Sequence, residues 1–143
     1  MSDDAGMDPI FFEDVAFLTV EQVNALHEEA IRRYSPGESL NIRDAGLLES
    51  AVATPQQTWG GEYLYGSIEE MAAAYLIGLN QNHAYENGNK RVAFAACSTF
   101  LRMNGYHLIL TEDEAVELTL EIACGRMERE QVVEIIRNGI TVL

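Results

Sequence analysis

Two apolar segments flank a polar connection in the stretch SIEEMAAAYLIGLNQNHAYENGNKRVAFAACSTFLRMNG, residues 67–105, and this stretch decides the fold. Ser67 with Glu70 three residues later is a capping-box pattern, and the apolar residues that follow it have helical spacing. This first helix should end near Asn82. A second helix is predicted to begin at about Gly88 and to end at 104–105, an Asn-Gly pair typical of a helix C-terminus.

Four further helices are predicted around this pair. Capping-box patterns begin at Thr19 and Thr111, and Asp44 can cap a short helix that ends before Pro55. The expected spans are about 20–34, 44–54, 111–124 and 128–138. Alternating aromatic residues beside a glycine pair at 56–66 indicate an extended loop or a small hairpin, and 106–110 could form a short strand. The predicted fold class is all-α, a helical bundle of about six helices with a small β-hairpin or flap loop.

Length and charge narrow the function. A chain of 143 residues, nearly half of them apolar, can form one ordinary domain, which we assign to residues 18–143 after an acidic lead-in at residues 1–17. The net charge of −14 argues against binding to a nucleic-acid backbone. No apolar stretch approaches the roughly 20 residues that cross a bilayer, and the acidic start differs from a secretory leader. These features predict a cytoplasmic protein that binds neither nucleic acid nor membranes.

Some residues with reactive side chains are expected to be structural. Cys97 and Cys124 lie in apolar helical patterns without a ligand partner, so we expect reduced thiols in the core. His27, on the first helix, has no second ligand at the next turn and is expected to be half-exposed.

The connection at residues 83–91 is far more polar than a turn between core helices requires. A glycine-containing turn that leads into a helix presents free backbone N–H groups and the positive end of the helix dipole, both suited to phosphate oxygens. Lys90 and Arg91 oppose that dipole unless an anion is bound, so their position favours a phosphate ligand. The His83 imidazole is a natural general base for a hydroxyl that attacks phosphorus. Tyr85 is expected to be a buried anchor for this loop.

This run of nine residues, His-Ala-Tyr-Glu-Asn-Gly-Asn-Lys-Arg, resembles the signature of the Fic/Doc family, and the likeness in length and helix order extends from Leu18 to about Ile140. The resemblance implies the Fic fold with ATP and Mg²⁺ bound at the loop. It makes His83 the catalytic base, assisted by Lys90 and Arg91. The implied nucleotide and phosphate contacts are Asn87, Gly88, Asn89, Lys90 and Arg91. Asn87 occupies a position at which Asp is commoner in the family, and it would help to place the Mg²⁺ that is bound to the nucleotide.

Two positions favour the Doc (death-on-curing) type within this resemblance. Lys90 stands where adenylylating members have Gly, and Phe94 stands where they have a second Arg. Doc-type members pass the γ-phosphate of ATP to a threonine of elongation factor Tu, which blocks translation, and they are silenced by an antitoxin of the Phd type. The resemblance thus implies a toxin of a toxin-antitoxin system. Inhibition in cis is not expected, because the nearest candidate helix, 58–62, contains a glycine pair.

Two alternatives stay open at this point. One is protein adenylylation (AMPylation), the reaction of the Fic type. The other is a degenerate, non-catalytic binding module that keeps a partner groove, because a neutral amide at Asn87 is a poorer Mg²⁺ ligand than a carboxylate.

Overall fold

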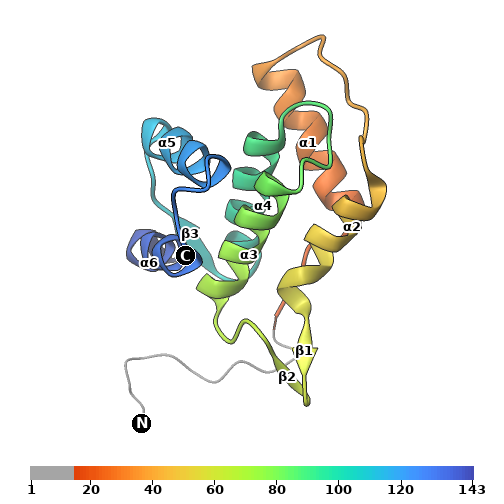
Figure 1. The fold of residues 1–143 in the computed structure, drawn as a ribbon. Helices are drawn as coiled ribbons and strands as arrows, with labels where there is room; N and C mark the ends of the chain where they lie inside the picture. The colour runs from red at the N-terminus through yellow and green to blue at the C-terminus, as the bar shows by residue number, and fades with distance from the viewer. Residues whose placement is uncertain (1–14) are drawn as a thin grey trace.

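A computed structural model describes residues 15–143, and within that range six α-helices form a bundle with two small antiparallel strand pairs (Figure 1). The all-α prediction is confirmed. In chain order the elements are α1 (Val20–Tyr34), α2 (Ala45–Ala53), the 3₁₀ turn η3 (Thr54–Gln56), β1 (Thr58–Trp59), β2 (Glu62–Tyr63), α3 (Ile68–Gln81), α4 (Asn89–Met103), β3 (Tyr106–Leu108), α5 (Glu112–Ala123), α6 (Arg129–Gly139) and β4 (Ile140–Val142).

Helix α3 is the centre of the bundle, and α4 packs along it. Its residues from Met71 to Leu76 are all buried, because other helices and the 3₁₀ turn cover it on several sides. Tyr75, 0% exposed, places a polar hydroxyl in this buried segment. Its hydroxyl accepts a hydrogen bond from the Leu18 backbone N–H at 2.9 Å, and burial raises the pKa of this phenol to about 12. The helix that leads into the candidate loop is thus held firmly.

The caps predicted from sequence fix the helix starts, with one difference. Of the three predicted capping boxes, two form completely, at Thr19 for α1 and at Thr111 for α5. At α3 only half of the pattern forms. The Ser67 hydroxyl accepts a hydrogen bond from the Glu70 N–H, but the Glu70 carboxylate accepts from the N–H of Gly66 and not from that of Ser67. The helix still begins where predicted.

The hairpin predicted within 56–66 is present as β1 and β2, with Thr58 paired to Tyr63. It precedes α3, whereas the polar loop follows α3, so the two lie at opposite ends of this helix (Figure 1). A helix of this length is about 21 Å long, and the hairpin is too distant to close over His83. The β3–β4 pair was expected only as one strand at 106–110. The partner β4 was missed because its pairing with Tyr106 joins segments distant in sequence.

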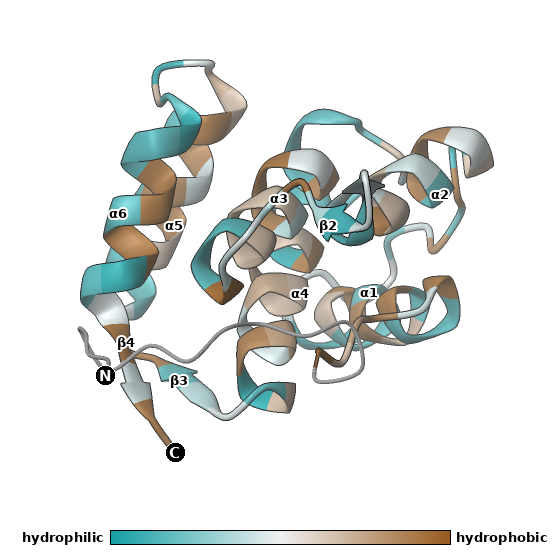
Figure 2. Ribbon diagram, turned by 90° about the horizontal axis from the view of Figure 1, so that it is seen from below, coloured by the Kyte–Doolittle hydropathy of each residue, from teal (hydrophilic) through white to brown (hydrophobic). Residues whose placement is uncertain are grey.

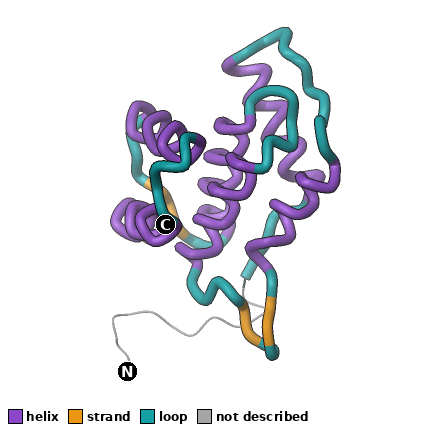
Figure 3. The backbone as a smooth tube through the Cα atoms, in the orientation of Figure 1, coloured by secondary structure: helices purple, strands orange, loops and turns teal. Residues whose placement is uncertain are grey.

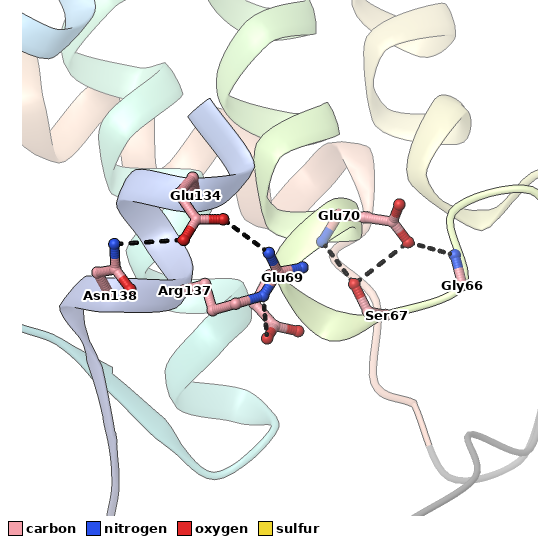
Figure 4. Close-up of polar contacts among 7 residues, drawn as sticks. All are labelled: Gly66, Ser67, Glu69, Glu70, Glu134, Arg137 and Asn138. Carbon is pink, nitrogen blue, oxygen red and sulfur yellow. Dashed lines mark hydrogen bonds and ion pairs between the residues drawn. The ribbon is translucent and has the colours of Figure 1, made fainter. Parts of the chain in front are cut away.

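The carboxyl-terminal helix α6 packs on α3 and buries Val132, Val133 and Ile136. Brown and teal bands alternate along this helix in Figure 2. An ion pair ties it to the start of α3 (Figure 4). Glu69 lies in the first turn of α3 with its side chain only 7% exposed, and the Nε of Arg137 lies 3.5 Å from one of its oxygens. Arg137 also contacts Glu134 on its own helix at 3.0 Å. The other oxygen of Glu69 is buried without a hydrogen-bond partner.

The structure also bears on the expectations for the two cysteines, the amino-terminal lead-in and membrane-spanning helices. Cys97 is buried as predicted, but Cys124 is exposed, because it caps the end of α5 where the apolar pattern stops. Most of the proposed lead-in, residues 1–14, lies outside the described residues. From residue 15 onward the chain packs on the bundle, with the ring of Phe17 stacked on Phe100. Among residues 15–143 no helix is long and apolar enough to span a membrane.

Candidate active site

Figure 3 shows the loop that joins α3 to α4. Two of its residues have a left-handed backbone. Gly88 adopts φ +78° as the N-cap of α4, a conformation that glycine allows. His83 adopts φ +52° and is the one non-glycine residue with positive φ in the described part of the chain. Such a conformation costs of order 1–3 kcal/mol and is concentrated at functional sites. The loop therefore holds an exposed His83 in a conformation that its surroundings must enforce.

A neighbouring loop supplies part of that support. Residues 41–44, just before α2, run antiparallel to the candidate loop with Ile42 bridged to Tyr85 (Figure 3). The Ala84 carbonyl accepts hydrogen bonds from the backbone N–H groups of residues 43 and 44, at 2.7 and 3.1 Å. The side chain of Arg43 adds a third tie, because its Nε donates to the His83 carbonyl at 2.8 Å. Arg43 thus holds the backbone of the candidate base directly.

Asn89, predicted to contact the nucleotide, uses its side chain within the loop. Its Oδ1 accepts from the Tyr85 N–H at 3.0 Å, and its Nδ2 donates to the Tyr85 carbonyl at 2.9 Å. This two-point contact satisfies both backbone groups of Tyr85. The side chain of Asn89 therefore shapes the loop, while its backbone N–H remains part of the first turn of α4, where helix geometry leaves N–H groups free.

Tyr85 is buried, as predicted, and packs on α1. Its ring stacks on the imidazole of His27, with ring centroids 3.7 Å apart and planes 9° from parallel. Its hydroxyl donates to Asn24 Oδ1 at 2.5 Å, and burial raises its pKa to about 12. The anchor therefore joins the loop to two residues one turn apart on α1.

His27 corrects an expectation, because it is 2% exposed rather than half-exposed. Its Nε2 lies 2.7 Å from the Asn87 carbonyl oxygen, which can only accept, so Nε2 carries the proton. Burial lowers the pKa of His27, and the hydrogen bond to Asn87 partly opposes that shift. Sequence reasoning gave this residue no role in the site. One signal was present: His27 lies four residues after Val23 and four before Ile31, both on the buried face of α1.

Gly88 is required for space as well as for conformation. A Cβ at this position would stand 2.9 Å from Cδ1 of Ile31 and 3.5 Å from Nε2 of His27. The loop thus approaches α1 more closely than any larger residue permits. Because residue 88 has no side chain, the backbone at the start of α4 is accessible to an anion.

The two basic residues follow in the first turn of α4, and both are exposed. No acidic residue lies in that turn, so the positive end of the helix meets two further positive charges. The Arg91 guanidinium lies over the ring of Tyr34, 3.7 Å from its centroid. Lys90 and Arg91 also border a groove of about 510 Å³ between α1, α4 and α5. His83 does not line that groove.

The groove has an apolar interior and a charged rim. Its apolar lining residues are Leu26, Ala30, Phe94, Ala95, Leu110, Ala115, Val116 and Leu120. Val116 and Leu120, one turn apart on α5, are each 45% exposed. At the rim stand Lys90, Arg91 and Arg33 together with Glu29 and Glu112. Phe94, which stands where adenylylating members of the resembling family have a second arginine, lines this groove and adds no charge to it.

The predicted site residues His83, Asn87, Gly88, Asn89, Lys90 and Arg91 thus lie on one loop and the first turn that follows it. The residues that sequence reasoning missed are Asn24 and His27 beneath the loop, Arg43 beside it and Tyr34 under Arg91. Each belongs to the segment 24–43, far from the motif in sequence. Within residues 15–143 no three His, Cys, Asp or Glu side chains are grouped closely enough to hold a metal ion.

A helical domain in which a histidine-bearing loop leads into a glycine-capped helix is the arrangement expected for the Fic/Doc signature. Residues 17–101 match the Fic/DOC family, and the chain belongs to that family. Two relatives are Doc proteins. The chain is 46% identical over 89 residues to Toxin Doc of Mycolicibacterium smegmatis, which is 61% of this chain and 68% of that protein. It is 30% identical over 123 residues to Protein kinase doc of Escherichia phage P1, 85% of this chain and 93% of that protein.

Proposed function

We propose that this protein is the toxin of a toxin-antitoxin pair and transfers the γ-phosphate of ATP to a hydroxyl group of a protein, with a threonine of elongation factor Tu as the substrate. The observation that carries the proposal is the juxtaposition of a strained, exposed histidine and a glycine-capped helix start with two basic residues. The names of the two Doc relatives, one a toxin and one a protein kinase, support the same reading.

In this reaction His83 accepts the proton of the substrate hydroxyl as that oxygen forms its bond to the γ-phosphorus. The bond from phosphorus to the bridging β-phosphate oxygen breaks, and ADP leaves with that electron pair. Phosphoryl transfer needs mainly positioning and positive charge. The N–H groups of the first turn of α4, with Lys90 and Arg91, would hold the phosphates and offset the charge that develops on them.

The residues fit a metal that is held mainly by the nucleotide. Mg²⁺ usually keeps several waters and binds through one or two protein groups plus substrate phosphates. Asn87, partly exposed in the loop, and Glu86, exposed next to it, are the side chains that would contact the ion or its waters. When bound, Mg²⁺ neutralises charge on the phosphates.

A protein substrate is favoured over a small molecule by the exposed apolar surface of the segment that pairs with the candidate loop. Leu40 and Ile42, in the loop that pairs with the candidate loop, are 46% and 42% exposed. Apolar side chains in such a position would contact the segment of the substrate around the target hydroxyl. Lys90, with Phe94 in place of a second arginine, favours phosphate transfer over adenylylation within this family resemblance.

We further propose that the antitoxin binds the groove between α1, α4 and α5. An amphipathic helix fits a groove that has an apolar interior and a charged rim. Because Lys90 and Arg91 stand on that rim, a bound segment would restrict the two residues that hold phosphate. Binding and inhibition would then be one event.

The test is to incubate the protein with Mg-ATP and purified elongation factor Tu and to measure the mass added to the factor. A gain of one phosphate that is lost with His83→Ala supports the proposal. An adenylate on the factor would refute phosphate transfer and favour the Fic-type reaction. A protein that modifies nothing and binds no Mg-ATP, but still binds the antitoxin, would be the non-catalytic module instead. Far-UV circular dichroism of His83→Ala checks that the variant is folded.

A further inference from the structure

Helix α1 contributes a buried histidine to the candidate site although none of its residues belongs to the motif. His27 is 2% exposed, lies under the loop, and donates through Nε2 to the Asn87 carbonyl at 2.7 Å. It also contacts Tyr85 by ring stacking. A buried imidazole could fill such a space by packing alone. The hydrogen bond to one particular carbonyl indicates a second role.

The direction of that carbonyl determines the direction of an amide. No peptide bond in the described residues is cis, so the Asn87–Gly88 peptide is trans, and its C=O and N–H point in opposite directions. His27 holds the C=O toward α1. The Gly88 N–H therefore points away from α1. No hydrogen-bond partner for this N–H occurs among the described residues, and it directly precedes the free N–H groups at the start of α4.

We infer that His27 is a positioning residue for phosphate binding: its Nε2–H fixes the Asn87–Gly88 peptide so that the Gly88 N–H joins the anion cradle. This inference rests on the proposed function of the loop. It assigns to α1 the orientation of one amide, which the motif alone does not specify. A peptide that is free to rotate would present its carbonyl oxygen to the phosphate in part of the molecules, and that oxygen repels an anion.

Two substitutions separate the hydrogen bond from the packing. His27→Phe keeps an aromatic ring against Tyr85 and removes the donor. His27→Gln removes the ring and keeps an N–H donor at a similar reach, because the glutamine Nε2 lies about as far along the side chain as the histidine Nε2. We expect His27→Phe to weaken Mg-ATP binding about tenfold, since it leaves a buried carbonyl unpaired, and His27→Gln to remain within about threefold of wild type.

The measurements are the Kd for Mg-ATP by calorimetry, the kcat and KM of transfer, and Tm for each variant. A higher Kd and KM in His27→Phe with rescue in His27→Gln supports the inference. The reverse order, with Gln worse than Phe, would show that ring packing alone matters. Equal losses of Mg-ATP affinity in the two variants, in proportion to their losses in Tm, would also overturn the inference.

A readout without turnover separates this inference from the proposed function. In ¹⁵N NMR of the wild-type protein, the His27 imidazole should be the Nε2–H tautomer with a slowly exchanging proton, and His27→Phe should shift the Gly88 amide resonance. If these signals appear while wild type neither binds Mg-ATP nor transfers phosphate, the proposed function fails and the peptide orientation stands. If wild type transfers phosphate and His27→Phe is equally active, the inference fails and the function stands. A rapidly exchanging or absent Nε2 proton would overturn the inference directly.

Discussion

At the residue scale, the candidate site depends on backbone conformations that side chains elsewhere enforce. His83 has a left-handed backbone, and Arg43 donates to its carbonyl from the loop before α2. Gly88 has the same handedness and leaves no room for a Cβ beside Ile31. The polar motif therefore carries the candidate chemistry, whereas α1 and the 41–44 segment fix its shape.

Gly88→Ala should lower the free energy of unfolding by about 2 kcal/mol, because it combines left-handed strain with a clash against Cδ1 of Ile31. Gly105→Ala is the matched control. Its φ is +94°, but nothing lies within 4 Å of the added Cβ, so only the strain of roughly 1 kcal/mol should remain. Urea unfolding measures both variants.

A second substitution tests the clash itself. Ile31→Val removes the Cδ1 atom and should cost about 1 kcal/mol in the wild-type background. In the Gly88→Ala background it should cost less, because it relieves the contact. The close approach of the loop to α1 would be contradicted if Gly88→Ala and Ile31→Val had additive effects on the free energy of unfolding. It would also be contradicted if Gly88→Ala and Gly105→Ala lowered that free energy equally.

At the element scale, the local signals in the sequence predicted the helices well, since a cap and an apolar period are properties of one segment. Thr19, Asp44, Ser67 and Thr111 all cap the helices predicted from them. Contacts between elements were not predictable in this way. His27 meets Asn87 across 60 positions, and Arg43 meets His83 across 40. Such pairs follow from the packing of α1 and α2 beside α3 and α4, which no local pattern specifies.

The groove is a property of three helices, and its proposed role predicts a binding defect without loss of stability. Val116→Glu places a carboxylate in the apolar part of the groove, on a side chain that is already 45% exposed. We expect antitoxin affinity to fall at least about tenfold, because the charge would be buried without a partner. The measurement is calorimetric titration with a purified antitoxin of the Phd type.

Val142→Glu is the control for this test, as the same chemical change on an 80% exposed side chain outside the groove. Both variants should keep the wild-type Tm within a few degrees. Unchanged antitoxin affinity in Val116→Glu, or an equal loss in Val142→Glu, would place the antitoxin elsewhere on the surface.

At the scale of the whole molecule, α3 connects the site to the rest of the bundle. Its carboxyl-terminal end leads into the loop, and its first turn holds Glu69 against Arg137 of α6 (Figure 4). A nearly buried carboxylate with one unpaired oxygen is sensitive to loss of Arg137, the one cation that contacts it within residues 15–143. This ion pair therefore differs from the exposed pairs on α1, such as the one between Arg33 and Glu29, whose side chains are each 65% exposed.

Arg137→Met should lower the free energy of unfolding by about 1 to 2 kcal/mol, since it keeps the apolar stem and leaves Glu69 buried without its cation. The half-exposed position of Arg137 keeps the expected loss below that of a fully buried pair. Arg33→Met breaks an exposed pair and should change stability by less than about 0.5 kcal/mol. If Arg137→Met and Arg33→Met lower the free energy of unfolding equally in urea, the burial of Glu69 does not strengthen its ion pair.

The hairpin at the far end of α3 also decides how such unfolding can be followed. It holds Trp59, the only tryptophan of the chain, with 80% of its surface exposed. An indole already in contact with water emits nearly as it would in the unfolded chain, so tryptophan fluorescence would hardly register the loss of the core. The same position makes Trp59 a reporter for anything that approaches the hairpin, while the helical signal in circular dichroism follows the bundle that carries the site.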